Sequence, residues 1–142
     1  MACRRSVIVR WSPIALLLSL TACDPVESED AGSTPQQVDL CEVSTRVFEP
    51  DCLSCHGADA SPPDLTLEGA RVGLVDVESG SYPGKILVVP GDPAGSLLFR
   101  KMNGTQAADE GDIMPIGAPS PADKVQTFER WIEGGAGLTC SP

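Results

Sequence analysis

Three residues near the middle of the chain have the types and the spacing of a cofactor-attachment motif. Cys52, Cys55 and His56 form the pattern C-x-x-C-H. Two thiols at this spacing can each add to one vinyl group of a haem, and the histidine that follows directly can then bind the iron. His56 is the only histidine in the sequence. The pattern therefore predicts one covalently bound haem c.

Two other kinds of site use some of the same residues. A zinc site needs four ligands, and few remain after Cys52, Cys55 and His56 are counted. A redox-active C-x-x-C pair is typical of an alternating strand–helix pattern, which this sequence does not contain. We favour haem attachment, with zinc binding and dithiol chemistry as the alternatives.

Length and composition restrict what the rest of the chain can be. Its 142 residues allow one small domain with appendages. Aromatic residues make up 4%, and thirteen prolines and fourteen glycines imply many loops. A loop-rich domain with so few aromatics is short of core, and a bound haem would supply a large apolar centre. The formal net charge of −10 argues against nucleic-acid binding, because phosphates attract lysine and arginine.

Residues 1–22 have the pattern of an export signal. Three arginines precede a short apolar stretch at residues 14–20, which is too short for an ordinary membrane span. The sequence LTAC at residues 20–23 resembles the lipobox of bacterial lipoproteins, and this resemblance implies a lipid on Cys23. The alternative is an ordinary secretory signal with an incidental cysteine. The lipoprotein interpretation anchors the protein by lipid to the cell membrane or the outer membrane, with its domain in the periplasm.

A polar segment separates this signal from the part of the chain that can fold. Residues 23–37 carry almost no apolar side chains, so we expect a disordered tether. The domain then covers residues 38–142. Apolar spacing within it predicts four helices, at residues 38–49, 67–75, 94–102 and 121–133. Residues 85–89 are expected to be strand-like, and residues 105–119 to form one long loop.

Helix start and stop signals refine these boundaries. Pro50 is expected to end the first helix. Ser120 is expected to cap the last one, with Pro121 at the first helical position and Asp123 completing a capping box. Two glycines at residues 134–135 then end that helix.

With these elements placed, the chain resembles the class I c-type cytochromes, and in particular the small planctomycete-type cytochrome c domains. The resemblance covers about residues 38–137. Besides the haem motif, three segments carry it: VPGDP leading into SLL at residues 89–98, Met-Pro at 114–115, and RWIEGGA at 130–136.

This resemblance implies an all-α class I cytochrome c fold. The first and last helices of that fold cross beside a covalently bound haem, with one aromatic side chain from each near the crossing. Phe48 and Trp131 match those two places. The sequence departs from the family at Ile116, where a second proline often follows the Met-Pro pair.

The second axial ligand of the iron decides between functions, because a haem with two protein ligands moves electrons and one with an open position binds small molecules. No second histidine exists, so Met102 and Met114 are the candidates in the domain. Met102 falls on the inward face of a predicted helix, as expected of a core residue. Met114 falls in the long loop, before a proline that stiffens it. We predict Met114 as the ligand, with Met102 or an open position as alternatives.

Two cysteines remain after those of the leader, the lipid and the haem are counted. Cys41 lies in the first predicted helix and Cys140 just beyond the last one. The crossing of these helices in class I cytochromes implies that the two thiols can meet. We therefore expect a disulfide in an exported protein, and two free thiols are the alternative.

These inferences together predict a single-haem c-type cytochrome lipoprotein. It would transfer one electron between redox partner proteins in the cell envelope, without being an enzyme and without binding nucleic acid. The alternative is a haem-based sensor or peroxidase-like protein with an open sixth position.

Overall fold

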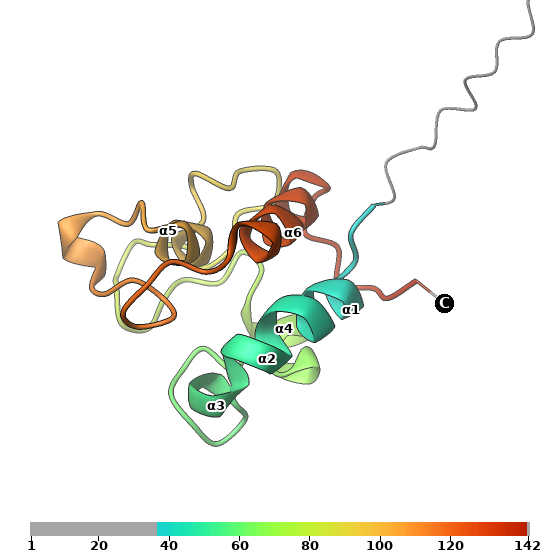
Figure 1. The fold of residues 1–142 in the computed structure, drawn as a ribbon, viewed down its shortest axis with the longest axis horizontal. Helices are drawn as coiled ribbons and strands as arrows, with labels where there is room; N and C mark the ends of the chain where they lie inside the picture. Colours follow the sequence, from blue (N-terminus) through green and yellow to red (C-terminus); the bar gives the residue numbers. More distant parts are fainter. Residues whose placement is uncertain (1–36, 142) are drawn as a thin grey trace, which may run out of the picture. The chain divides into compact units, whose positions relative to one another are not determined.

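The structure, a computed structural model, describes residues 37–141. Within this range the domain is all-α, as predicted, with helices joined by loops and no β-strand (Figure 1). The predicted signal peptide 1–22, Cys23 and all of the tether except Gln37 lie outside the described residues. No helix within residues 37–141 is long and apolar enough to cross a membrane. The α-helices are α1 (Leu40–Val43), α2 (Glu49–Asp51), α3 (Leu53–His56), α4 (Leu67–Gly73), α5 (Leu97–Asn103) and α6 (Ala122–Glu133).

The first helical segment does not end at Pro50 as expected. A π-helical turn, Ser44–Phe48, joins α1 to α2, and Pro50 is the second residue of α2. Proline is tolerated near a helix start, because its missing N–H would have no partner there. After the wider π turn, α-helical hydrogen bonding begins again with α2, so that the proline lies near the start of a helix. The segment continues to Asp51, and the Cys52 amide still donates to the carbonyl of Phe48.

The predicted middle elements form with small shifts of their ends. In α4 the hydroxyl of Thr66 caps the helix by accepting from the Gly69 amide. Helix α5 ends at Gly104, which has a φ of 73° that favours glycine. Residues 85–89 are extended but pair only through isolated bridges, including Val75 with Val88.

The expected capping box at the start of α6 is wrong. The helix begins at Ala122, one residue later than predicted, with Pro121 as its cap residue and no side-chain hydrogen bond to the first turn. Ser120 belongs to the preceding loop, because its amide donates to the carbonyl of Met102 at the end of α5. Its buried hydroxyl therefore does not cap α6, and Asp123 has no capping role.

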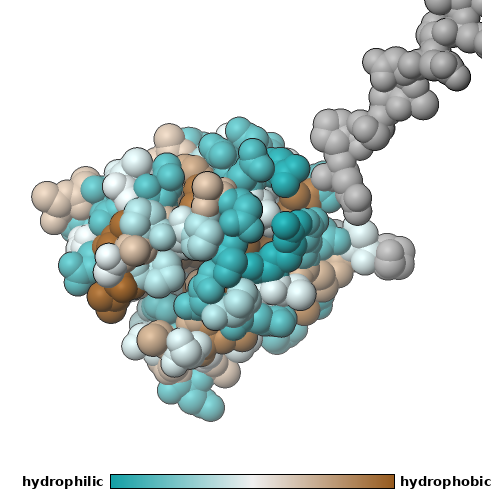
Figure 2. Space-filling model, viewed as in Figure 1, coloured by the Kyte–Doolittle hydropathy of each residue, from teal (hydrophilic) through white to brown (hydrophobic). Residues whose placement is uncertain are grey.

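An aromatic contact joins the first helical segment to α6. Phe48 meets Phe128 edge to face, with ring centroids 5.8 Å apart, and Trp131 lies against Phe128 at 5.5 Å. Phe128 thus lies in contact with both Phe48 and Trp131, the two residues that the resemblance placed near the helix crossing. All three rings are buried, whereas the surface in Figure 2 is largely hydrophilic, with scattered apolar areas.

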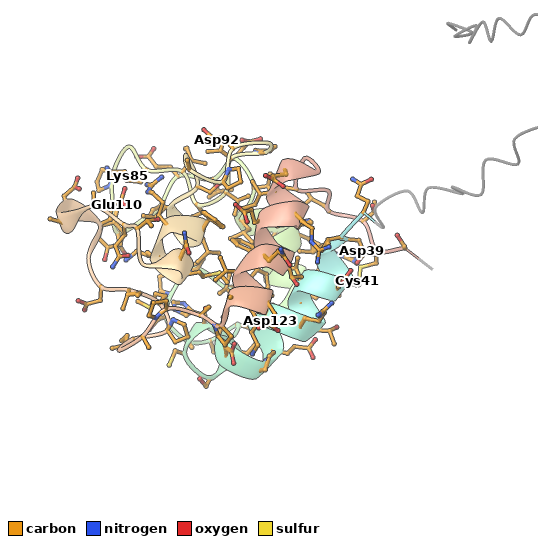
Figure 3. The ribbon with its side chains drawn as sticks, turned by 45° about the horizontal axis from the view of Figure 1, so that its top comes forward. Asp39, Cys41, Lys85, Asp92, Glu110 and Asp123 are labelled. Atoms are coloured by element: carbon orange, nitrogen blue, oxygen red, sulfur yellow. A yellow bond between two sulfur atoms is a disulfide. The ribbon has the colours of Figure 1, made fainter. Side chains whose placement is uncertain are left out.

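The two ends of the domain are tied to each other. The structure contains the predicted disulfide between Cys41 and Cys140, whose Cα atoms lie 5.3 Å apart. Beside it, the Asp39 carboxylate accepts from the amides of Ser141 and Glu42, and these bonds lower its pKa (Figure 3 labels Asp39 and Cys41). The C-terminal tail is thereby fixed against the start of α1.

The disulfide should contribute strongly to stability. It joins residues 99 apart in sequence, and closing a loop of about 100 residues contributes roughly 4–5 kcal/mol in the chain-entropy view. We expect the Cys41→Ser/Cys140→Ser variant to lose stability on this scale in urea unfolding. Thiol titration of the denatured, unreduced protein should find neither cysteine free, and two free thiols would contradict the pairing.

Candidate functional site

One cavity of about 580 Å³ collects the residues that the sequence singled out. Cofactor and ligand pockets typically measure roughly 300–1,000 Å³, so the volume suits a cofactor. Its walls come from α2, α3 and α5, from the loop after α3, from the segment between α4 and α5, and from the loop before α6. Cys52, Cys55, His56 and Met114 all line it.

His56 is held with one ring nitrogen bonded and the other available. Its Nδ1 lies 2.9 Å from the carbonyl oxygen of Ser61. Because a carbonyl can only accept, Nδ1 carries the proton and Nε2 keeps its lone pair for a metal. The loop after α3, which contains Ser61, is itself fixed. The Ser61 amide donates to the carbonyl of Cys55, and the Leu65 amide donates to the carbonyl of His56.

The two motif cysteines are unpaired and differ in exposure. Cys55 is exposed, whereas Cys52 is partly buried with its sulfur 3.6 Å from the carbonyl oxygen of Val47. Burial, assisted by the negative charge of Asp51, raises the pKa of Cys52 to about 11. Cys52 is therefore a protonated thiol at neutral pH.

Both methionine candidates reach the cavity, from different kinds of structure. Met102 is 2% exposed and belongs to α5 and to the hydrophobic core. Met114 lies in the loop and is half-buried, with its amide donating to the carbonyl of Lys101 over 3.0 Å. That Met114 rather than Met102 serves as the ligand stays a prediction.

The loop that carries Met114 is anchored through a buried carboxylate. Glu110, whose side chain is 2% exposed, pairs with Arg100 of α5 and with Lys85 (Figure 3). The hydrogen bonds from Arg100, opposed in part by burial, lower the pKa of Glu110 to about 2. The phenol of Tyr82 also packs against the loop at Gly111, where a Cβ would lie 2.1 Å from its oxygen. The loop therefore has a fixed course despite its length.

These residues fit a covalently bound haem. Two thiols and an imidazole line the cavity from the segment at α3, and a thioether lines it from the loop before α6. Apolar side chains of Phe48, Leu65, Leu87, Leu97 and Leu98 contribute to its walls. Within residues 37–141 no three His, Cys, Asp or Glu side chains form a group that could hold a metal ion.

Sequence reasoning missed the charged residues of the site. Glu110 and Lys101 are the two buried charged side chains of residues 37–141. Neither stands out in sequence, because their partners Arg100 and Asp112 are ten and eleven positions away. Lys101 lies two positions after the buried Phe99 in α5, and this spacing does not indicate that the lysine side chain is buried.

Comparison with protein-family models, with curated proteins and with solved structures finds no match to this chain. The interpretation of the cavity therefore depends on its residues and their geometry.

The Glu110 ion pairs should make stability depend on acid pH. The pKa of Glu110 is about 2 when folded and 4.5 in a free side chain, so its contribution is complete above pH 4.5 and is lost as pH falls through 2. We expect Glu110→Gln to be less stable at neutral pH and to lose less between pH 4.5 and 2 than the wild type. Urea unfolding between pH 4.5 and 2 measures the free energy of unfolding of each protein, with a substitution of an exposed glutamate, Glu133→Gln, as the control. Equal pH profiles for wild type and Glu110→Gln would contradict the assignment.

Proposed function

We propose that this protein is a single-haem c-type cytochrome that transfers one electron between redox partner proteins. The observation that carries the proposal is the convergence of Cys52, Cys55, His56 and Met114 on one apolar-walled cavity. The resemblance of the sequence to class I cytochromes agrees with it. The chain would act as a carrier rather than as an enzyme.

Each residue of the cavity has a distinct role in this proposal. When bound, haem supplies the one-electron chemistry of its iron. Cys52 and Cys55 would hold the porphyrin through thioether bonds. His56 would bind the iron through Nε2, and the bond from Nδ1 to Ser61 keeps that nitrogen oriented. Met114, which lines the same cavity from the loop before α6, would offer its thioether as a second ligand.

A carrier role suits the chemistry that the chain can offer. The only histidine is engaged at the cavity, so no imidazole remains for general acid–base catalysis. The anchored loop keeps Met114 at the cavity, which favours a closed sixth position over the open one of a sensor or peroxidase.

Charge indicates the kind of partner that such a carrier would meet. The chain carries 20 acidic and 10 basic residues. Complementary surface charge speeds encounter between proteins, so the redox partners should present basic docking faces. The same charge disfavours nucleic acid.

The proposed location is the cell envelope, with lipid on Cys23 as the anchor. Cys23 and the leader lie outside the described residues, so the support is the sequence pattern alone. Cys23→Ser should move the protein from the membrane fraction to the soluble fraction without altering its absorption spectrum. Retention of this variant on membranes after a high-salt wash would count against the lipid anchor.

The choice between the two methionines has a direct test. Met114→Leu should abolish the weak red absorption band of ferric methionine–iron coordination and allow carbon monoxide to bind. It should also lower the reduction potential, on the order of 0.1 V within the roughly 0.8 V that axial ligands span. Met102→Leu, a swap of similar volume, is the matched control and should keep band and potential. The reverse pattern would make Met102 the ligand, and a wild type without the band would favour the open-site alternative.

A further inference from the structure

The cavity wall contains a buried cation without an acidic partner. Lys101 is 5% exposed and is the only buried cationic side chain within residues 37–141. It lines the cavity, but it forms no ion pair with any carboxylate of this range. The other lysines of the range do, since Lys85 pairs with Glu110 and Lys124 with Asp51.

The contacts that Lys101 does make are with neutral groups. Its Nζ donates to the carbonyl of Asp112 over 2.9 Å and lies 4.5 Å from the ring centroid of Tyr82. A carbonyl and an aromatic face stabilise an ammonium group in part. They do not neutralise it, and a buried charge is unfavourable unless an opposite charge compensates it.

No acidic residue of the cavity is free to compensate this charge. Asp51 is the only carboxylate that lines the cavity, and it is already paired with Lys124. The missing negative charge must then come from what occupies the cavity. Haem carries two carboxylates on its propionate side chains, which makes it an occupant with the required charge.

We propose that Lys101 is the counter-ion of a haem propionate and that its charge raises the reduction potential. This inference rests on the proposed function. Reduction lowers the charge of the iron site by one unit, so a nearby cation favours the reduced state. Without Lys101 the propionate would also lose its partner, and its negative charge would favour the oxidised state. Both effects lower the potential when the ammonium is removed.

Three substitutions separate the charge of Lys101 from its other contacts. Lys101→Arg keeps the charge, Lys101→Gln keeps a hydrogen-bond donor without the charge, and Lys101→Met keeps neither. Arg46→Gln removes an exposed cation that pairs with Glu42 outside the cavity, and serves as the control. Each haem-loaded variant is compared with wild type by its reduction potential and its red methionine–iron band.

The proposal predicts a downward shift of the potential in Lys101→Gln and Lys101→Met, with the band retained. Lys101→Arg and Arg46→Gln should remain near the wild-type potential. If Lys101→Gln has the same reduction potential as Lys101→Arg, the residue acts only through its hydrogen bond to Asp112, and the proposal falls. It also falls if no variant shifts the reduction potential, because the charge of Lys101 would then have no effect on the iron.

A second measurement decides the matter if the neutral variants do not load haem. In a crystal structure of the haem-loaded wild type, Lys101 Nζ should form an ion pair with a propionate oxygen. An ammonium that contacts only Asp112 and Tyr82 would overturn the inference and leave the cytochrome proposal intact. A wild type that takes up no haem would instead remove both.

Discussion

The contact between Phe48 and Phe128 determines where the C-x-x-C-H motif lies. Helices α2 and α3 flank Cys52 and contribute no fully buried residue, so their position depends on the Asp51–Lys124 ion pair to α6 and on the buried residue that precedes them. Phe48 directly precedes α2, is buried against α6 and lines the cavity. An edge-to-face pair contributes roughly 0.5–1.5 kcal/mol beyond burial of its surface. At the other end of the first helical segment, the disulfide ties α1 to the tail that follows α6.

The loop before α6, which brings Met114 to the cavity, depends largely on charged side chains. It is fastened to α5 through Arg100 and Lys101. Arg100 is neutralised by Glu110 within the domain, whereas Lys101 has only neutral contacts there. The wall thus holds Met114 in place and also presents a positive charge to the cavity. The position of Met114 and the local electrostatics depend on neighbouring residues of one helix.

Local signals in the sequence predicted the elements, and most long-range contacts escaped it, apart from the Cys41–Cys140 disulfide. The apolar spacing at residues 94–102, for example, predicted the helix that forms as α5. The prediction that Pro50 ends the first helix failed, because a π turn precedes the proline and no residue type in the sequence indicates such a turn. The prediction that Ser120 caps α6 failed, because the Ser120 amide donates to the carbonyl of Met102 in α5, a helix distant in sequence. Motif spacing singled out Cys52, Cys55 and His56, and the lack of a second histidine left Met102 and Met114. All five line the cavity, whereas the burial of Lys101 and Glu110 depends on how the loop folds back.

The central claim is that the chain binds haem covalently through its two motif cysteines. The most direct measurement is a haem stain of the protein after denaturing electrophoresis, following expression with haem-attachment machinery. The account predicts that wild-type protein keeps its haem on the gel and that Cys52→Ala/Cys55→Ala loses it. A wild type without haem, or a double variant that retains covalent haem, would contradict the account.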